Sequence, residues 1–348
     1  MPTFDAKSLK IFGANLLMAA GASPEEAGTV AKYCVNANLV GHDSHGIMLI
    51  LNYVERIKAG HIQPGAPWEI VQESPTTTVV DGNWGFGFVV TEQAMKYTIK
   101  KAKTANVAAA TVFRQSHIGR LATYPLMAIE EGMIGLITAD SGRSPKTVAP
   151  FGGREARLGT NPISIAVPSN LESPLYLDMA TSAVSNGKVA VSAARNENIP
   201  EGWIIDSNGN HSTDPNKLKS GALLPLGGAT VGYKGTGLGA MVEILCGLLT
   251  GLGFGVEPSG FHNDGCFLAV FNVEAFRPLE DFKQEVADFA AYLNDTPPME
   301  GSSGVLYPGE IEKLSEVERR ERGIPIEGAT WEQLTELANE LGVNSNIG

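Results

Sequence analysis

A change of pattern near residue 76 constrains the fold more than any other feature of this chain. Between residues 76 and 276, short apolar runs alternate with loops rich in Gly, Pro and Ser and with helical segments. The runs are TTTVVD, VAAATVF, MIGLITAD, NPISIAVP, LYLDMA and CFLAVFNV. Short apolar runs bounded by turn residues predict strands, and their alternation with helical segments predicts an α/β fold.

Helical patterns flank this region on both sides. They cover residues 5–60, 279–294, 310–322 and 330–341. The sequence therefore predicts an α/β domain over residues 76–276, inserted between N- and C-terminal helical segments. These segments, residues 1–75 and 277–348, are expected to pack together into a second domain.

Two helices are outlined most clearly near the N-terminus. The stretch SPEE, residues 23–26, is a capping box with proline at the first helical position. A second helix is expected to start near Asp43 or Ser44 and to end at Gly60. Its predicted apolar face consists of Ile47, Ile50, Leu51, Val54 and Ile57.

Composition argues against several classes of partner. The net charge is -12 and the chain has no Lys/Arg-rich run, so we expect no nucleic-acid binding. The three cysteines, Cys34, Cys246 and Cys266, are widely spaced and odd in number, which favours reduced, buried thiols in a cytoplasmic protein. The apolar stretch 236–256 contains Glu243 and many glycines, so it predicts a buried helix and a Gly-rich turn rather than a membrane span.

Forty glycines invite a search for phosphate-binding loops. The spacing G-x-G-x-x-G of a Rossmann dinucleotide site does not occur, because GYKGTGLG and DGNWGFGFVV both depart from it. No G-x-x-x-x-G-K-[ST] loop occurs either. An enzyme built on this chain would therefore bind a nucleotide cofactor through a different fold.

The stretch GHDSHGIMLILNY, residues 41–53, contains the candidate chemistry. A zinc site fits poorly, because helical histidine ligands prefer a spacing of four. Ser44 and His45 are adjacent, and we do not expect adjacent helical side chains to form a nucleophile relay. If the helix starts here, His45, Leu49 and Tyr53 lie on one stripe, and the helix start lowers the pKa of His45. That arrangement suits a proton donor in a pocket, and a capping cluster with an exposed His45 is the open alternative.

His117 lies in FRQSHIGRLATY, just after a predicted strand that ends at Phe113. Loops that follow strands often carry functional residues. The residues alone nevertheless favour a solvated loop histidine at this position.

Seven motifs taken together resemble the type-2 malate/L-lactate dehydrogenase family. They are GHDSHGIMLILNYVERIKAG, SHIGRLATY, VAPFGGREARLGTNPISIAVPS, LYLDMATSAVSNGKV, IPEGWIIDSNGN, GYKGTGLGAMVEIL and LYPGE. The resemblance covers residues 5–342. It is strongest to the hydroxycarboxylate dehydrogenase B branch, through NLVGHDSHGI, SHIGR and RRERGIPIEGATW. The family also contains sulfolactate dehydrogenases and cyclic ketimine reductases.

The resemblance implies a nicotinamide cofactor, NAD or NADP, on a non-Rossmann domain with a mixed sheet, and a homodimer with its site in a cleft between domains. His45 matches the family's acid/base, and His117 matches its second active-site histidine, both beside the cofactor. The other positions that match cofactor-binding segments are Ile118, Gly119, Leu177, Asp178, Met179, Ala180, Thr181, Ser182, Lys234, Gly235, Pro308, Gly309 and Glu310.

One departure from the family pattern concerns the substrate. Many members carry an arginine that holds the substrate carboxylate at the position of Leu49. Here Arg120, Ser44 or backbone N–H groups would hold it, and an apolar wall at Leu49 and Tyr53 would favour a bulkier monocarboxylic acid. Thr160 and Asn161, in LGTNP, are expected either to bond near the nicotinamide or simply to shape the turn before proline.

The resulting hypothesis is reversible hydride transfer between NAD(P)H and C2 of a 2-oxo acid. His45, or else His117, would donate the proton, and Asp178 would orient a histidine or a polar water. Lys234 would contact a cofactor phosphate or else lie in solvent. The alternatives are a cyclic ketimine reductase, a non-catalytic cofactor-binding paralogue and, more remotely, a metal hydrolase, although no metal site is expected.

Overall fold

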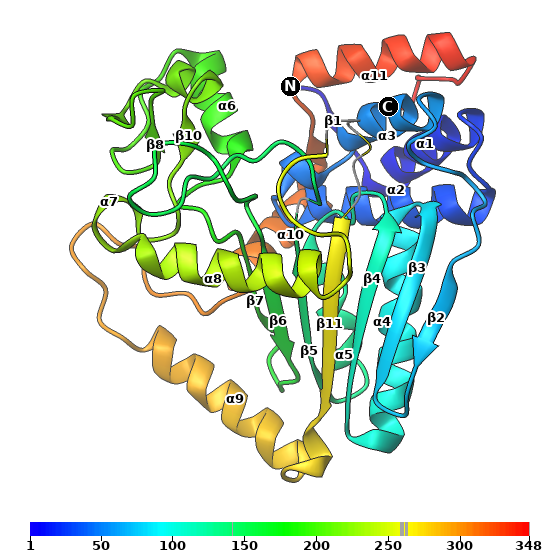
Figure 1. Ribbon diagram of the computed structural model, residues 1–348, viewed down its shortest axis with the longest axis vertical. Coiled ribbons are helices and arrows are strands. Elements are labelled where there is room, and N and C mark those ends of the chain that lie inside the picture. Colours follow the sequence, from blue (N-terminus) through cyan, green and yellow to red (C-terminus); the bar gives the residue numbers. More distant parts are fainter. Residues whose placement is uncertain (141, 258–260, 262–263, 348) are drawn as a thin grey trace.

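The computed structural model describes residues 1–140, 142–257, 261 and 264–347. Its central element is a seven-stranded mixed sheet in the order β2-β3-β4-β11-β5-β6-β7 (Figure 1). The strands are β2 (Glu69–Glu73), β3 (Thr77–Gly85), β4 (Val107–Gln115), β5 (Met133–Ala139), β6 (Ile163–Val167), β7 (Leu175–Met179) and β11 (Asp264–Asn272). β3 and β4 pair in parallel, and the other neighbours in this sheet pair antiparallel. The predicted α/β class and all six predicted strands are confirmed.

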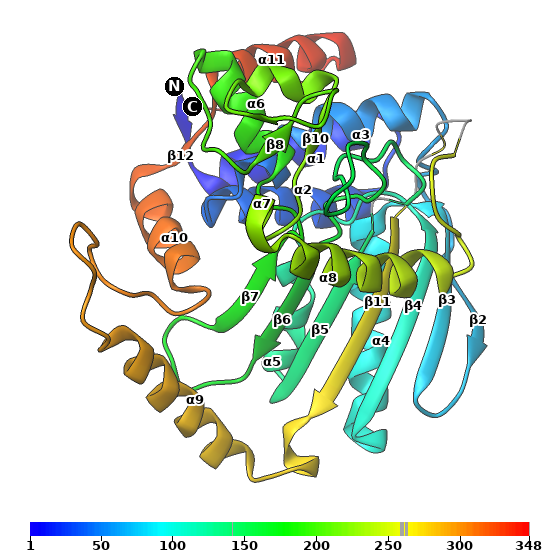
Figure 2. The same cartoon turned by 60° about the vertical axis from the view of Figure 1, so that its left-hand side comes forward.

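Helices cover both faces of the sheet. α4 (Gly87–Ala105) and α5 (Pro125–Ile129) pack on one face, where Val80, Met95, Val112, Ile137 and Leu268 are fully buried. α8 (Tyr233–Glu243) crosses the other face near one end of the strands (Figures 1 and 2). Each strand that lies between these layers needs apolar side chains on both faces, which explains the continuous apolar runs in the sequence.

The two ends of the chain pack together. β1 (Thr3–Phe4) pairs with β12 (Ile324–Pro325), and α11 (Gly328–Leu341) packs against α1 (Ala6–Ala19) and α3 (Leu49–Lys58). α2 (Pro24–Leu39) begins with the predicted capping box, which is confirmed. The side chains of Phe4 and Trp331 meet at 4.1 Å between ring centroids within the shared core. The exact domain boundaries at residues 75 and 276 stay a prediction.

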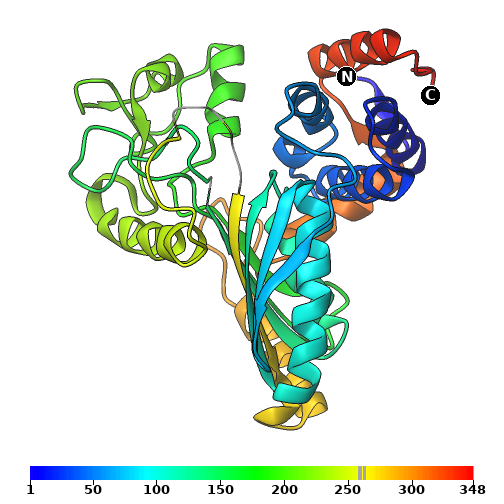
Figure 3. The same cartoon turned by 45° about the vertical axis from the view of Figure 1, so that its right-hand side comes forward.

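A third group of elements lies opposite the N- and C-terminal helices. α6 (Asn186–Arg195) and a small sheet of β8 (Ile204–Ile205), β9 (His211–Ser212) and β10 (Ala222–Leu223) form this lobe. Figure 3 shows the lobe and the terminal helices on either side of the upper end of the main sheet. The remaining elements are η1 (Asp43–His45), η2 (Leu121–Thr123), η3 (Pro215–Lys219), α7 (Gly228–Val231), η4 (Ile244–Leu248), η5 (Val273–Ala275), α9 (Leu279–Asn294) and α10 (Glu310–Arg322).

The helix predicted to begin at Asp43 or Ser44 is wrong in its first turn. Residues Asp43–His45 form the single 3-10 turn η1, Gly46 is extended at φ -86° and ψ -159°, and α3 begins only at Leu49. The cause is a contact from outside the segment, because the Ile47 N–H donates to the side-chain oxygen of Asn38 at 2.8 Å. A glycine between the two turns has little helical preference to resist this.

The stretch 236–256 also differs from its prediction. α8 ends at Glu243 and continues into the π-helical turn η4. Its inner side is buried, but Met241, Leu248 and Leu249 are about half exposed, so the helix is not buried on all sides. No helix in the described parts of the chain is long and apolar enough to cross a membrane. The three cysteines are free and buried, as predicted.

Candidate active site

The direction of the strands brings one set of polar side chains to one end of the sheet. β4, β5 and β7 run in one direction, whereas β6 and β11 run in the other. The C-terminal ends of the first three therefore lie beside the N-terminal ends of the other two. His117 follows β4, Asp140 follows β5, Asp178 lies near the end of β7, and Asp264 begins β11. The ends of strands in an open sheet are a usual place for a ligand site.

His45 and His117 meet above this end of the sheet. Their rings are 5.9 Å apart between centroids and inclined by 25°. Tyr53 Oη lies 2.8 Å from His117 Nδ1, and Ser44 Oγ lies 3.0 Å from His45 Nδ1. Without the family resemblance, the sequence favours a solvated loop histidine at position 117. That expectation is wrong, because the His117 side chain is partly buried and hydrogen-bonded to Tyr53. Ser44 and His45 contact each other within the 3-10 turn η1, and the expectation that they form no nucleophile relay stays a prediction.

The predicted stripe of His45, Leu49 and Tyr53 does not form. The break at Gly46 separates His45 from α3, and Leu49 packs against the core of the helical segments. Tyr53 is buried on the same helix but reaches His117 rather than His45. The two histidines are thus joined by tertiary packing and not by helical periodicity.

The pKa of His45 is set mainly by burial of its side chain. Burial lowers the pKa of His45 from its ordinary 6.5 to about 4, and repulsion from His42 and Arg120 contributes to the same shift. The predicted direction is confirmed, but the cause is desolvation rather than the positive end of a helix. The imidazole is therefore neutral at pH 7 in the free protein.

Asp178 and Arg120 form a buried pair next to the histidines. The carboxylate of Asp178 accepts the Ala122 N–H at 2.9 Å and lies 3.7 Å from Arg120 Nε. Arg120 Nη2 donates to the Tyr176 hydroxyl at 2.6 Å. Burial raises the pKa of Asp178, and the Arg120 charge opposes that rise. The contacts of Asp178 are thus with Arg120 and a backbone N–H. Its predicted role in orienting a histidine or a polar water stays a prediction.

Thr160 and Asn161 tie three segments together. The Thr160 carbonyl accepts the Thr181 N–H at 2.8 Å. Asn161 is fully buried at φ +38°, and its side-chain N–H group donates to the Gly239 carbonyl and to Glu243 Oε2, both at 2.9 Å. Both residues therefore shape the turn before Pro162, and their bonding to a nicotinamide stays a prediction.

A buried charge cluster lies next to this turn and was missed from the sequence. Lys146 Nζ lies 2.9 Å from Glu243 Oε1, and both side chains are less than 10% exposed. Asp140 lies nearby, and burial together with repulsion from Glu243 raises its pKa to about 7. Asp264 is similar, because burial raises its pKa to about 7 and its Oδ2 accepts the Ile118 N–H at 3.3 Å. The strand-end positions of the two aspartates were a usable signal, whereas nothing local marks Lys146.

The segments matched to cofactor binding lie at different places in the fold. Gly119 has φ +72°, and a Cβ there would lie 2.2 Å from the Phe88 ring. Leu177, Met179 and Ala180 are partly buried on or just after edge strand β7, and Thr181 and Ser182 are buried. At the start of α8, Lys234 is exposed and Gly235 is buried against the backbone of Leu226.

The Pro308–Gly309–Glu310 turn lies at the beginning of β7. The Pro308 carbonyl accepts the Tyr176 N–H at 3.1 Å, and Glu310 Oε2 accepts the Tyr307 N–H at 3.1 Å. A Cβ on Gly309 would lie 2.5 Å from the Pro174 carbonyl oxygen, and its φ of +101° also favours glycine. The turn therefore joins the start of α10 to the strand that carries Asp178.

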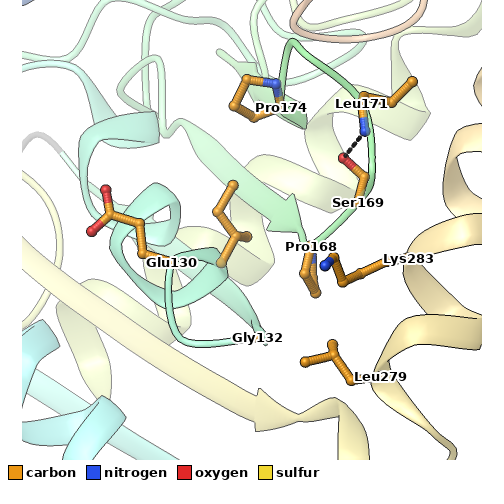
Figure 4. Close-up of a pocket in the computed structure, with 9 residues that line it drawn as sticks. Glu130, Gly132, Pro168, Ser169, Leu171, Pro174, Leu279 and Lys283 are labelled. Atoms are coloured by element: carbon orange, nitrogen blue, oxygen red, sulfur yellow. Dashed lines mark hydrogen bonds between the residues drawn. The ribbon is translucent and has the colours of Figure 1, made fainter.

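A cavity of about 220 Å³ lies elsewhere, between the end of α5, the β6–β7 loop and α9 (Figure 4). Glu130 and Lys283 are its charged lining residues, and no residue of the predicted site lines it. Among the residues that the structure describes, no group of three or more His, Cys, Asp and Glu side chains could hold a metal ion.

The family model described as malate/L-lactate dehydrogenase matches residues 4–335. This chain belongs to the malate/L-lactate dehydrogenase family. The malate/(S)-sulfolactate dehydrogenase of Methanothermus fervidus is 37% identical over 334 residues, 94% of this chain and 95% of that protein. Hydroxycarboxylate dehydrogenase B of Escherichia coli K12 is 33% identical over 349 residues, 98% of this chain and 94% of that protein.

One similar solved structure is named as a reductase rather than as a dehydrogenase. The Δ1-piperideine-2-carboxylate reductase of Pseudomonas syringae has a TM-score of 0.85 and 28% identity, covering 97% of this chain and 100% of that one. Members of the malate/L-lactate dehydrogenase family act on small hydroxy and oxo acids, and they use nicotinamide cofactors.

Proposed function

We propose that this protein is an NAD(P)-dependent oxidoreductase that interconverts a monocarboxylic 2-oxo acid and its 2-hydroxy acid. The observation that carries the proposal is the pair of facing imidazoles, His45 and His117, at the end of the sheet where strand-end polar residues gather, with His117 hydrogen-bonded to Tyr53. An imidazole is suited to give a proton to a carbonyl oxygen and to take it back from an alcohol at neutral pH.

We infer that two buried polar atoms would serve a nicotinamide cofactor. Arg120 Nε and Asn161 Oδ1 are buried without a hydrogen-bond partner among the described residues. They offer one donor and one acceptor in segments that match the family's site, and a carboxamide group presents the complementary acceptor and donors. When bound, the reduced nicotinamide supplies the hydride.

His45 supplies the proton in this proposal. In the oxidation direction the neutral imidazole, with its pKa lowered to about 4 by burial, accepts the proton of the hydroxyl group. In the reduction direction the carboxylate of the bound oxo acid favours the imidazolium, so binding itself promotes protonation of the donor. Tyr53 fixes the orientation of His117, the second imidazole that faces the substrate.

The preference for a single carboxylate rests on two positions. Leu49 replaces the arginine found in many family members, and it packs against the helical core. Arg120 is buried and already contacts Asp178 and the Tyr176 hydroxyl. Neither position offers a cation for a second carboxylate, so malate and sulfolactate are poor candidates.

We also propose that the protein is a cytoplasmic homodimer. α9 buries only Ala290 within the chain, while Phe289 and Tyr292 are 54% and 74% exposed. On α10, Ile311, Leu314 and Val317 are also more than half exposed. Apolar surface of this kind suits a subunit interface, and the free, buried cysteines suit a reducing compartment.

The test is the loss of reduced-nicotinamide absorbance with purified protein. NADH and NADPH would each be offered with pyruvate, phenylpyruvate, hydroxyphenylpyruvate, oxaloacetate and a cyclic imino acid. Turnover of the monocarboxylic acids that is abolished in His45→Ala supports the proposal. His211→Ala, at an exposed histidine of β9, is the matched control and should keep full activity.

The second candidate is reduction of a cyclic imine, favoured by the structural likeness to the piperideine-carboxylate reductase. Faster turnover of the imino acid than of every oxo acid would replace the first proposal with this one. Cofactor binding without any turnover would instead indicate a non-catalytic paralogue. Oxaloacetate as the best substrate would contradict the assignment to monocarboxylic acids.

A further inference from the structure

The turn that carries His45 is wrapped around one buried side chain. Asn38, 2% exposed near the end of α2, donates its side-chain N–H group to Asp43 Oδ1 at 2.7 Å. Its oxygen accepts the Ile47 N–H at 2.8 Å. A Cβ on Gly46 would lie 2.4 Å or less from the Asn38 amide atoms, so the turn closes tightly on that amide. His45 lies between the two anchored ends.

A side chain from α10 closes the same turn from outside. Arg319 Nη1 and Nη2 contact the two carboxylate oxygens of Asp43 at 2.6 and 2.9 Å. Arg319 Nη1 also donates to the Asn38 carbonyl at 2.5 Å. The Arg319 side chain is 19% exposed and that of Asp43 is 49% exposed, so the arginine side of this forked contact is the better shielded from water. A forked contact restrains direction as well as distance.

α10 makes a second and a third contact with the same segment. His42 Nε2 lies 3.2 Å from Glu312 Oε1. Gly41 packs so closely that a Cβ there would lie 3.2 Å from Ser315 Oγ. The three contacts come from one face of α10, because residues 312, 315 and 319 have the i, i+3, i+7 spacing. This face packs against residues 41–43.

We propose that Arg319 is a positioning residue that holds the His45 turn in its working geometry by clamping Asp43. The inference rests on the proposed function in so far as His45 is the acid/base. A displacement of about 1 Å at a reacting group can cost on the order of 100-fold in rate. His45 lies two residues from the clamped carboxylate, and its facing partner His117 is held separately through Tyr53. Loosening the clamp therefore moves one imidazole relative to the other.

The test compares Arg319→Gln and Arg319→Lys with Arg322→Gln. Arg322 lies on the same helix, and its exposed pair with Glu318 touches no part of the site. We expect kcat for the best 2-oxo acid to fall on the order of 10- to 100-fold in Arg319→Gln, with KM changing less than about 3-fold. Arg319→Lys keeps the charge but loses the fork, so its kcat should lie between those of Arg319→Gln and the wild type. Arg322→Gln should match the wild type.

A double variant decides whether Arg319 acts through Asp43. If it does, Asp43→Ala lowers kcat by a similar factor, and adding Arg319→Gln lowers it no further. Multiplying effects in the double variant would overturn the inference. If Arg319→Gln is too unstable to purify, Arg319→Lys combined with Asp43→Ala gives the same comparison.

A readout without turnover separates this inference from the proposed function. The imidazole proton signal of His45, assigned by its loss in His45→Ala, is titrated by NMR in each variant. The wild-type midpoint is expected near 4 because of burial, and Arg319→Gln should move it toward 6.5 as the loosened turn admits water. An unchanged midpoint would overturn the inference. If the midpoint shifts but the protein reduces no 2-oxo acid, the positioning role of Arg319 is supported and the proposed function is rejected.

Discussion

Replacing Lys146 by methionine should lower the stability of the folded protein more than most single substitutions. The substitution keeps the length of the side chain and removes its charge. Lys146 is 4% exposed and Glu243 is 9% exposed, and their charged atoms are 2.9 Å apart. The variant leaves the Glu243 carboxylate buried with the Asn161 amide as its remaining contact.

The expected cost follows from this burial. Removing one partner of a buried ion pair costs about 3–5 kcal/mol, because the other charge stays desolvated. Asp140 adds to the cost at alkaline pH. Its pKa is raised to about 7 in the folded protein, so the stability it contributes when protonated is lost as the pH rises through 7. Without Lys146, its ionisation meets an uncompensated Glu243, so the loss should be larger at pH 8 than at pH 6.

Urea unfolding followed by fluorescence of the four tryptophans measures the change. Lys146→Met, Glu243→Gln and the double variant form a cycle, in which the double variant should recover most of the lost stability. Arg157→Met, which breaks the exposed pair with Glu155, is the control and should change stability by less than about 1 kcal/mol. A loss below about 1 kcal/mol in Lys146→Met, or simple additivity in the double variant, would refute the reasoning.

Three further predictions concern the histidines and their loop. Tyr53→Phe removes the 2.8 Å contact with His117, and steady-state kinetics should show kcat/KM falling about 2- to 13-fold, the equivalent of one hydrogen bond. Since the folded-state pKa of His45 is lowered to about 4, its contribution to stability is full above pH 6.5 and declines as the pH falls to 4, by about 3 kcal/mol in all. Urea titrations at pH 7 and pH 4.5 should therefore show a smaller pH-dependent loss in His45→Gln than in the wild type, and equal losses would contradict the assigned shift. Gly119→Ala should lower the melting temperature by several degrees, because φ is +72° and the new Cβ would meet the Phe88 ring at 2.2 Å; an unchanged melting temperature would mean that this loop adapts freely.

The strands could be predicted because their apolar runs are local signals. β4, β5 and β11 are buried on both faces, so nearly every side chain carries the pattern. β2 was missed because four of its five residues are exposed, which is typical of an edge strand. The short strands β8 and β10 have two residues each, too few for any period to be visible.

The geometry of the histidine turn was not predictable from its own residues. From Ile47 onward the apolar spacing is helical, and the prediction extended that helix back to Asp43. The turn is instead fixed by Asn38, at the end of the preceding helix, and by Arg319, 276 residues away. Side-chain contacts over such separations leave no periodic trace in a single sequence.

His45 was a candidate from its own stretch of sequence, the family resemblance added Asp178 and raised His117, and the arrangement of the three came from the fold. The structure brings the two imidazoles together. It also pairs Asp178 with Arg120. The cluster of Lys146, Glu243 and Asp140 had no motif to mark it, because its members come from three separate segments.

Burial acts in opposite directions on the acids and bases at this end of the sheet, and the two effects together suit the proposed reaction. Desolvation lowers the pKa of His45 to about 4, and it raises those of Asp140 and Asp264 to about 7. The free site therefore carries fewer charges near neutral pH than its composition suggests. In the proposed reaction, the carboxylate of a bound 2-oxo acid would favour the protonated form of a nearby imidazole. Under the proposed function, the neutral His45 of the free protein would serve oxidation directly, and substrate binding would prepare the same residue for reduction.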